Sequence, residues 1–436
     1  MTTGGGAASP DYRAAIAALA TRTTLGVRLG LERTRALLDA CGAPHERLQT
    51  LHIAGTNGKG STCATLDAVL QRQGFTTGRY SSPHLIDFRE RVLVNGAAIS
   101  ETQVMRWLDA HRADIDRLGA TFFEATTAMA FDLLVQAGVD IAVIEVGLGG
   151  RLDSTNVLTP LVAAVTSIGL DHREFLGNTL TEIAREKAGI FKRNVPAVIG
   201  ERDPDVIATL RDAAERAGAS RIVVTAGTLP VQSATLSAEG TDMVFGAGDT
   251  RLTLTSALMG EHQAQNVATA IEVLRAAGAP WTPTLAALRD GVRTTRLAGR
   301  FQRVGPWVFD VAHNPDGMTT VVRSLGAMAL PRPLGAVVCV LSDKDWKAML
   351  ETLLPAIDAV WLTDAPTVPP SRRWPLREAI AFAQERSRGR VRVTCAPDFG
   401  HALADAAQHA ATVLVTGSFH TVGDAMERLE IDPLAG

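Results

Sequence analysis

Short segments that are apolar at almost every position recur along this chain of 436 residues, and longer stretches with the periodicity of amphipathic helices separate them. A strand without polar positions has to be covered on both faces, as happens in a parallel sheet flanked by helices. The chain is also long enough for two or three domains. We therefore expect an α/β fold whose first parallel sheet contains LQTLHIAG (48–55), IAVIEVG (141–147), VAAVTSIG (162–169) and PAVIG (196–200).

The pattern changes from about residue 221 to residue 258 and then returns to the α/β rhythm. RIVVTAG (221–227), LPVQSATLSAEG (229–240) and TRLTLTSALMG (250–260) alternate apolar and polar residues around glycines, which predicts a small antiparallel sheet. We interpret RTTRLAGR (293–300) as a linker. A second α/β domain is expected beyond it, with strands in WVFDVAH (307–313), LGAVVCVLS (334–342), AVWLTDA (359–365), RVRVTCA (390–396) and TVLVTGS (412–418).

The composition excludes several classes of protein. The net charge is -3 and no basic run occurs, so nucleic acid is not an expected partner. The four cysteines are scattered without the spacing of zinc ligands, which is typical of reduced cytosolic thiols. The first residues lack the pattern of a signal peptide, and no apolar run approaches the length of a membrane span. We therefore expect a cytoplasmic protein without a membrane anchor.

The sharpest local signal is a glycine-rich loop between an apolar strand and a helix pattern. In LHIAGTNGKGST the loop runs from Gly55 to Ser61 and contains Lys59. Glycines allow backbone N–H groups to surround an anion, the helix N-terminus adds positive dipole, and Lys59 adds a mobile cation. The spacing differs from the common GxxxxGK[ST] loop. An ordinary glycine-rich turn is the alternative, but the lysine in this setting favours a phosphate-binding loop.

Three charged or metal-binding side chains follow at the ends of predicted elements. Glu145 lies in an otherwise apolar strand, where a carboxylate needs a metal or a partner such as Arg151. His172 follows the next strand, where a structural role is the alternative. Lys187 ends a helix pattern, where complementing the helix dipole is the alternative.

Binding of ATP and Mg²⁺ would account for all three residues. Phosphoryl transfer uses Mg²⁺, which is held by few protein ligands, and these are mostly oxygen atoms. Glu145 suits that role, His172 is an unusual but acceptable ligand, and Ser82 in YSSPHL offers a hydroxyl group.

A dozen segments occur in the same order as in the folylpolyglutamate synthase and dihydrofolate synthase family, relatives of the Mur ligases, and the chain resembles that family over nearly its whole length. They are LGLER (29–33), AGTNGKGST (54–62), YSSPHL (80–85), ERVLVNG (90–96), TFFEATT (121–127), IEVGLGGRLDSTN (144–156), SIGLDH (167–172), EKAGIFK (186–192), GRFQ (299–302), FDVAHNP (309–315), DKD (343–345) and TGSFHTV (416–422).

The resemblance implies a fold and a domain division. Residues 1–297 are expected to form a Mur-ligase-like ATP-binding domain, with a P-loop parallel sheet and the small antiparallel sheet. Residues 298–436 are expected to form a Rossmann-like glutamate-ligase domain. Closure of the two domains about RTTRLAGR would complete the site.

The resemblance also implies a role for each site residue. Lys59, His172 and Lys187 are expected to be catalytic, with Lys187 carried as an N-carboxylated lysine, and Ser82, Glu145 and His172 to bind Mg²⁺. ATP is expected on Thr56, Asn57, Gly58, Lys59, Gly60, Ser61, Asn266, Arg300 and Asp310. The pterin substrate is expected on Thr121, Phe123, Leu152, Asp153 and Ser154, and the incoming glutamate near His313 and Ser418.

The activity implied is ATP-dependent ligation of L-glutamate to dihydropteroate and to tetrahydrofolates through an acyl phosphate, by a monomeric enzyme. Arg28 departs from the acidic residue that bifunctional bacterial members often carry there, which bears on the pterin contact. A monofunctional synthase is an alternative. A peptidoglycan ligase of the Mur type is another, but the phosphate loop begins by residue 55 and leaves no room for the extra N-terminal domain. A P-loop switch protein is a third alternative, and it gives no reason for Lys187, Arg300 and Asp310.

Overall fold

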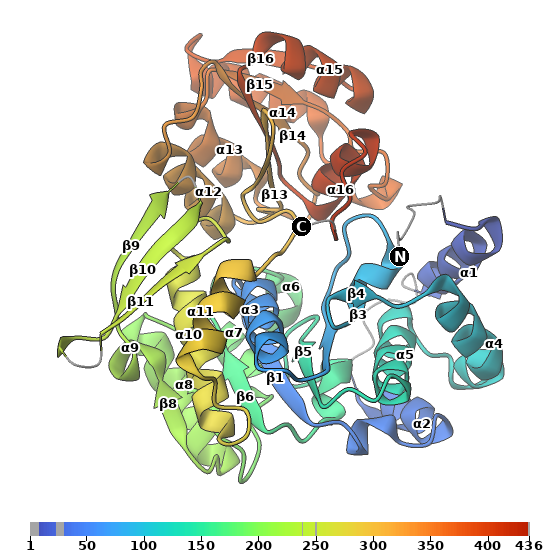
Figure 1. Ribbon diagram of the computed structural model, residues 1–436. Coiled ribbons are helices and arrows are strands. Elements are labelled where there is room, and N and C mark those ends of the chain that lie inside the picture. The colour runs from blue at the N-terminus through green and yellow to red at the C-terminus, as the bar shows by residue number, and fades with distance from the viewer. Residues whose placement is uncertain (1–7, 23–29, 238, 249–250, 435–436) are drawn as a thin grey trace.

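The computed structural model describes residues 8–22, 30–237, 239–248 and 251–434. Within these residues the strands form sheets of eight, three and six strands. The first two sheets and their helices, up to residue 294, form what we call the N-terminal lobe. The six-stranded sheet and its helices, residues 302–434, form the C-terminal lobe, which lies above the N-terminal lobe in Figure 1.

The eight-stranded sheet is parallel except at one edge. Its order is β4-β3-β2-β5-β1-β6-β7-β8, and only β3 and β4 run antiparallel to their neighbours. Its strands are β1 (Thr50–Ala54), β2 (Thr77–Tyr80), β3 (Val92–Val94), β4 (Ala97–Ala98), β5 (Ile141–Glu145), β6 (Val162–Val165), β7 (Ala197–Ile199) and β8 (Ile222–Val224).

Helices cover both faces of this sheet, as the continuously apolar strands predict. Leu51 and Ile53 of β1 pack on one face with α3 and α10, whereas Ala54 packs on the opposite face. The first face carries α3 (Lys59–Arg72), α10 (Gln263–Ala277) and α11 (Leu285–Thr294). The opposite face and its margins carry α1 (Pro10–Ala20), α2 (Glu32–Ala40), α4 (Glu101–Leu118), α5 (Phe122–Gln136), α7 (Leu180–Ala188) and α8 (Pro204–Ala217).

The small antiparallel sheet is present, but one predicted strand does not belong to it. Its strands are β9 (Val231–Ser237), β10 (Gly240–Phe245) and β11 (Leu252–Ser256), in the order β11-β10-β9. The segment RIVVTAG instead forms β8, which pairs in parallel with β7 at the edge of the large sheet. The prediction was wrong because a three-residue strand is too short for its alternation to distinguish the two sheets. The central strand β10 was not predicted.

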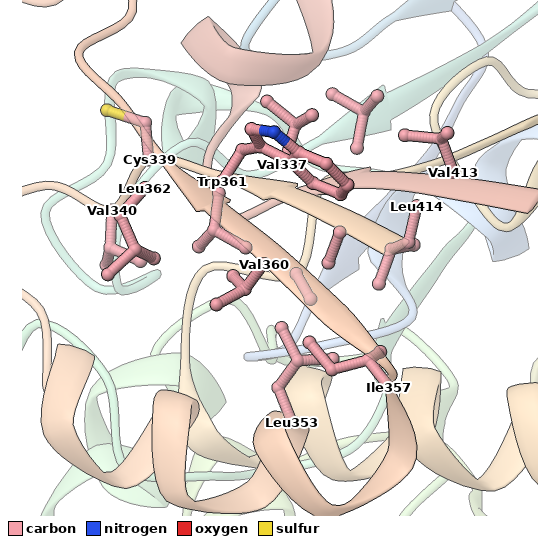
Figure 2. Packing of buried hydrophobic residues seen from close by; sticks show 14 of the residues in the cluster. Val337, Cys339, Val340, Leu353, Ile357, Val360, Trp361, Leu362, Val413 and Leu414 are labelled. Atoms are coloured by element: carbon pink, nitrogen blue, oxygen red, sulfur yellow. The ribbon is translucent and has the colours of Figure 1, made fainter. Parts of the chain in front are cut away.

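The C-terminal lobe has a second sheet covered by helices on both faces. Its order is β12-β13-β17-β14-β15-β16, parallel except for β12. Trp361 of β15 and Val360 beside it point to opposite faces, with Val360 towards Leu353 (Figure 2). The strands are β12 (Gln302–Val304), β13 (Trp307–Asp310), β14 (Leu334–Val338), β15 (Ala359–Leu362), β16 (Arg392–Cys395) and β17 (Thr412–Thr416). The helices are α12 (Pro315–Ala327), α13 (Trp346–Leu353), α14 (Leu376–Ser387), α15 (Phe399–His409) and α16 (Phe419–Arg428).

The predicted fold class is therefore confirmed: an α/β unit with a phosphate-loop sheet and a small antiparallel sheet, followed by a second α/β unit. In the described ranges no helix is long and apolar enough to cross a membrane.

Candidate active site

The predicted phosphate loop connects β1 to α3 at the carboxyl edge of the large sheet. Gly55 and Gly58 have φ values of +151° and +87°, and a Cβ on Gly58 would lie 2.4 Å from Oδ1 of Asn266. These positions therefore require glycine for both backbone conformation and space. Thr56 holds the loop against the segment after β6, since its backbone N–H donates to Ser167 at 2.7 Å.

Lys59 begins α3 and folds back over the loop. Its Nζ donates to the carbonyl oxygens of Gly55, at 3.0 Å, and of Thr56, at 3.1 Å. A lysine held by neutral loop carbonyls can transfer its N–H groups to phosphate oxygens when a nucleotide binds.

The loop opens into a cleft of about 160 Å³ between the two lobes. Fourteen of the predicted site residues line this one cleft, although they come from segments spread over 258 positions of the chain. They are Thr56, Asn57, Gly58, Lys59, Gly60, Ser61, Ser82, Glu145, His172, Lys187, Asn266, Arg300, Asp310 and His313. Asn57, Gly58 and Asn266 also border a neighbouring cavity of about 790 Å³.

Glu145 ends β5 and is only 4% exposed. Burial raises the pKa of its carboxyl group, and the positive charges of Lys59 and Arg300 offset part of that rise. The alternative partner Arg151 is not available, because its guanidinium pairs with Glu186 at 3.0 Å. A buried carboxylate that faces a cleft without that partner is suited to bind a cation.

The predicted Mg²⁺ ligands suit an ion that also binds phosphate oxygens and water, and they suit less well an ion surrounded by protein ligands alone. Ser82, Glu145 and His172 all face the cleft. Burial lowers the pKa of His172 to about 4, so the imidazole is neutral near pH 7, as a metal ligand must be. Among the described residues no group of three His, Cys, Asp or Glu side chains gathers to hold a metal. Mg²⁺ sites with only one or two protein carboxylates take their remaining ligands from water and phosphate oxygens.

Lys187 lies in the last turn of α7 and is 5% exposed. Burial, helped by the charge of Lys59 and opposed by Asp171, lowers the pKa of its amine to about 7. A neutral amine is the form that adds CO₂, so the residue fits the predicted N-carboxylation.

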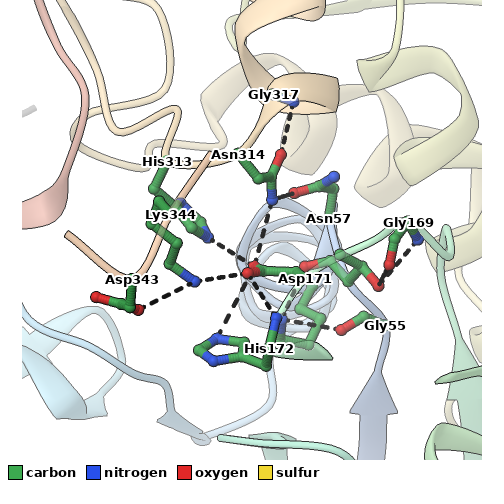
Figure 3. A network of polar contacts seen from close by, with 12 residues as sticks. Gly55, Asn57, Gly169, Asp171, His172, His313, Asn314, Gly317, Asp343 and Lys344 are labelled. Atoms are coloured by element: carbon green, nitrogen blue, oxygen red, sulfur yellow. Dashed lines mark hydrogen bonds and ion pairs between the residues drawn. The ribbon is translucent and has the colours of Figure 1, made fainter. Parts of the chain in front are cut away.

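Asp171 joins the two lobes (Figure 3). It is 8% exposed and lies in the N-terminal lobe, yet its Oδ1 is 2.5 Å from Nζ of Lys344 in the C-terminal lobe. Its Oδ2 is 3.3 Å from Nε2 of His313 and 3.4 Å from Nδ2 of Asn314. Burial would raise the pKa of Asp171, but these partners outweigh burial and hold the pKa well below its usual range.

Sequence reasoning assigned no role to Lys344 or Asn314. Lys344 was visible only as the centre of the short segment DKD, and its partner lies 173 residues earlier. The sequence shows Lys344 between two acids after the predicted strand 334–342, but this pattern does not identify its partner.

The C-terminal lobe contributes further groups to the cleft. Asp310 ends β13 and accepts backbone N–H groups from Phe301, at 2.8 Å, and Ala312, at 2.9 Å. Burial raises the pKa of Asp310 to about 6, and Arg300 opposes this rise. The guanidinium of Arg300 also lies over the ring of Phe419, 5.5 Å from its centroid.

Ser418 and His313 were both predicted near the incoming glutamate. His313 lines the cleft, whereas the hydroxyl group of Ser418 caps a helix. Ser418 is 1% exposed, and its Oγ caps α16 by accepting the N–H of Thr421 at 3.1 Å. Its hydroxyl group therefore has a structural partner, and the neighbouring Phe419 lines the cleft instead.

The predicted pterin-binding residues gather around the loop that follows β5. A Cβ on Gly147 would lie 2.4 Å from Cζ of Phe123, so this ring packs directly on the loop. Asp153 is 5% exposed and its Oδ2 accepts the N–H groups of Gly147 and Leu148, at 3.0 and 2.8 Å. Thr121 caps α5, whereas Leu152 and Ser154 flank Asp153. Arg28 lies outside the described residues.

Comparisons with known proteins identify the class of this fold and site. Residues 53–274 match the Mur ligase middle domain, and residues 299–419 match the Mur ligase glutamate ligase domain. The two lobes, with the phosphate loop in one and the cleft between them, are thus those of a ligase of the Mur type.

Close relatives narrow this class to one family. The dihydrofolate synthase/folylpolyglutamate synthase of Escherichia coli is 37% identical over 412 residues, which cover 93% of this chain and 92% of the relative. A solved structure of the E. coli protein with DHPP and ADP has a TM-score of 0.83 at 34% identity, covering 98% of this chain and 99% of that one. A Mycobacterium tuberculosis folylpolyglutamate synthase complexed with ADP has a TM-score of 0.87 at 32% identity, covering 97% of this chain and all of that one.

The chain belongs to the dihydrofolate synthase/folylpolyglutamate synthase family. The predictions that it resembles this family and that it is an ATP-dependent ligase are confirmed.

Proposed function

We propose that the enzyme joins L-glutamate both to dihydropteroate and to tetrahydrofolates, through an acyl phosphate formed with ATP. The observation that carries this proposal is the single cleft in which Lys59, Glu145 and Lys187 of one lobe face Arg300 and His313 of the other. A cleft that combines a phosphate loop with groups from a second lobe can bring three substrates together and exclude water.

ATP is proposed to bind with its phosphates on residues 56–61 and its adenosine in the neighbouring cavity beside Asn266. The space supports this assignment, because the cavity of about 790 Å³ adjoins the phosphate loop and is bordered by Asn57 and Gly58. The ADP complexes of the E. coli and M. tuberculosis relatives support it as well. Arg300 and Asp310 are proposed to complete the nucleotide site from the C-terminal lobe.

Ser82, Glu145 and His172 are proposed to hold Mg²⁺, which, when bound, neutralises charge on the phosphate oxygens. Lys187 is proposed to act as a carbamate. Its depressed pKa supports this proposal, and the modification replaces a cation by an anion at a site that already contains Lys59.

The reaction has two balanced steps. A carboxylate oxygen of the acceptor attacks the γ-phosphorus of ATP, the bond to the β-phosphate oxygen breaks, and ADP leaves with an acyl phosphate remaining. The amine of glutamate then attacks the acyl carbon, the carbon–oxygen bond to phosphate breaks, and inorganic phosphate and one proton are released. Lys59 stabilises charge on the transferring group, and His313 lies where it can orient the glutamate.

The pterin is proposed to stack on Phe123, with Thr121, Leu152, Asp153 and Ser154 completing its pocket. Asp153 shapes this pocket through its hydrogen bonds to Gly147 and Leu148. The names of two relatives support activity on both acceptors. The E. coli relative and an M. tuberculosis relative, 34% identical over 446 residues, are both called dihydrofolate synthase/folylpolyglutamate synthase.

The test is ADP release by the purified enzyme with Mg²⁺, ATP and L-glutamate, offered 7,8-dihydropteroate or tetrahydrofolate, with mass spectrometry of the products. We expect one added glutamate on each acceptor. Product from only one acceptor would establish a monofunctional synthase, and ADP release independent of both acceptors would refute the proposal.

The domain boundary, the location, the oligomeric state and the kind of partner also belong to the proposed function. We infer a boundary between the domains at residues 297/298, which agrees with the separation of the sheets and with the limits of the two matched family domains. We also infer a cytoplasmic monomer that binds small molecules and no nucleic acid, in keeping with the net charge of -3.

A further inference from the structure

Another cavity, of about 220 Å³, adjoins the catalytic cleft, and we call it the Arg79 pocket. It lies between α3, β2, the loop that follows β2 and the linker segment 294–300. Gly60, Ser82, Glu145 and Arg300 line both the pocket and the cleft. A ligand that reacts beside Glu145 can therefore extend directly into the pocket.

The sequence builds this pocket with small residues on one face of a helix. Gly60, Ala64 and Ala68 recur every four residues on α3 and line the pocket, which leaves room between the helix and the sheet. Arg79 of β2 is the register partner of Val143 in β5, and Glu145 lies two residues further along β5. Because side chains alternate along a strand, Arg79 and Glu145 point to the same face of the sheet, towards α3.

Arg79 is a buried cation whose pairing is incomplete. It is 9% exposed, and its Nε has no hydrogen-bond partner within the part of the chain that the structure describes. The ion-pair partner found for it among the described residues is Asp67, whose Oδ2 is 3.7 Å from NH1, beyond good hydrogen-bonding distance. The other oxygen of Asp67 already accepts from Thr77, at 2.5 Å, and Gln71, at 2.9 Å.

Two further acids, Glu90 and Glu145, line the pocket. Burial raises the pKa of Glu145 and the charge of Arg79 opposes that rise, but among the described residues the ion pair found for Arg79 is with Asp67. Glu90 accepts the backbone N–H groups of Leu85, Ile86 and Asp87, at 2.6 to 2.8 Å. A buried guanidinium without a well-placed carboxylate is costly, and its planar fork of N–H groups can bind both oxygens of a carboxylate. Arg72 and Arg296 add positive charge at the exposed rim.

We propose that the Arg79 pocket binds the second, non-reacting carboxylate of an acceptor that ends in glutamate. The inference rests on the proposed function. Dihydropteroate has a single carboxylate, which must react, so it leaves the pocket without an anion. A folate ends in a glutamate with two carboxylates. When one of them lies beside Glu145 for phosphorylation, the other is only a few bonds away, within reach of Arg79.

Arg79 is therefore a specificity residue that distinguishes the two acceptors. The exposed Arg72 and Arg296 at the rim extend the positive surface outward, in the direction that further glutamyl residues of a longer acceptor would follow.

The first experiment compares wild type, Arg79→Gln and Arg79→Lys with both acceptors. We expect Arg79→Gln to lower kcat/KM for tetrahydrofolate relative to that for dihydropteroate by about 10- to 100-fold, mainly through KM, as for loss of a charged hydrogen bond. Arg79→Lys should recover part of the ratio. Arg211→Gln, at an exposed position of α8, is the matched control and should leave the ratio at the wild-type value. An unchanged ratio for Arg79→Gln would overturn the inference.

The second experiment uses the wild-type enzyme, so it does not depend on the folding of a variant. Two tetrahydrofolate analogues carry an amide in place of either the α- or the γ-carboxylate of the terminal glutamate. The analogue amidated at the reacting position should give no product, whereas the other should react with kcat/KM lowered by about 10- to 100-fold. Full activity of that second analogue contradicts the proposal. A wild-type enzyme that uses dihydropteroate alone also overturns this inference, while leaving the acyl-phosphate chemistry standing.

Discussion

Replacement of Lys187 by methionine should make the protein more stable and less active at the same time. The amine is 5% exposed in the last turn of α7, and burial lowers its pKa from the usual 10.5 to about 7. Methionine has a similar length and volume, so it fills the same space without a charge to desolvate. The same substitution removes the amine that we propose to be carboxylated, so ligase activity should be lost.

The magnitude follows from the two pKa values. Between pH 7 and 10.5 the unfolded chain holds a proton that the folded protein has released, so the stability of the wild type rises with pH across this window. The cost of burying Lys187 is fully present below about pH 7 and disappears above about pH 10.5. It amounts to about 4.6 kcal/mol at about pH 6.5 and about 2 kcal/mol at about pH 9.

Urea denaturation of wild type and Lys187→Met, in CO₂-free buffer at both pH values, measures this difference. The excess stability of the variant should shrink as the pH rises. Added bicarbonate should stabilise the wild type alone, because only the wild type can bind CO₂ at this amine. A variant that is less stable than wild type at the lower pH, or an excess that grows with pH, would refute the reasoning.

Three further predictions concern the cleft. Lys59→Ala and Glu145→Ala should each abolish acceptor-dependent ADP formation in a coupled assay while leaving the circular dichroism spectrum unchanged; residual turnover above a few per cent would contradict the assigned roles. Lys344→Met should weaken the contact between the two lobes by about 3–5 kcal/mol, because the buried charge of Asp171 then lacks its closest partner. Small-angle scattering should show a larger radius of gyration, and Asp171→Asn in the same chain should reverse part of the change. ¹³C NMR with labelled bicarbonate should show a carbamate signal that grows as the pH rises through about 7 and is absent in Lys187→Met.

The local part of the site could be predicted from the sequence. The phosphate loop was recognisable because glycines with positive φ, a lysine and a helix start follow one strand within a few residues. Glu145 stood out because it is the single charged residue in an apolar strand. Ser418 was placed near the incoming glutamate by the family resemblance and not by its local sequence, and that placement stays a prediction. Its hydroxyl group caps α16, and a residue at a helix N-terminus has the same local sequence pattern whether it binds a ligand or the helix itself.

The sequence by itself determined most of the strands in the two large sheets, the alternation of strands with helices and the phosphate loop, because each of these depends on residues close together in the chain. Only the tertiary structure decided that β8 joins the large sheet, that Asp171 meets Lys344 across 173 positions, and that the ion pair of Arg79 with Asp67 is as long as 3.7 Å. The physical reason is that these facts depend on how whole layers pack. Whether a buried charge is paired is set by side chains from distant segments, and periodicity along one segment carries no information about them.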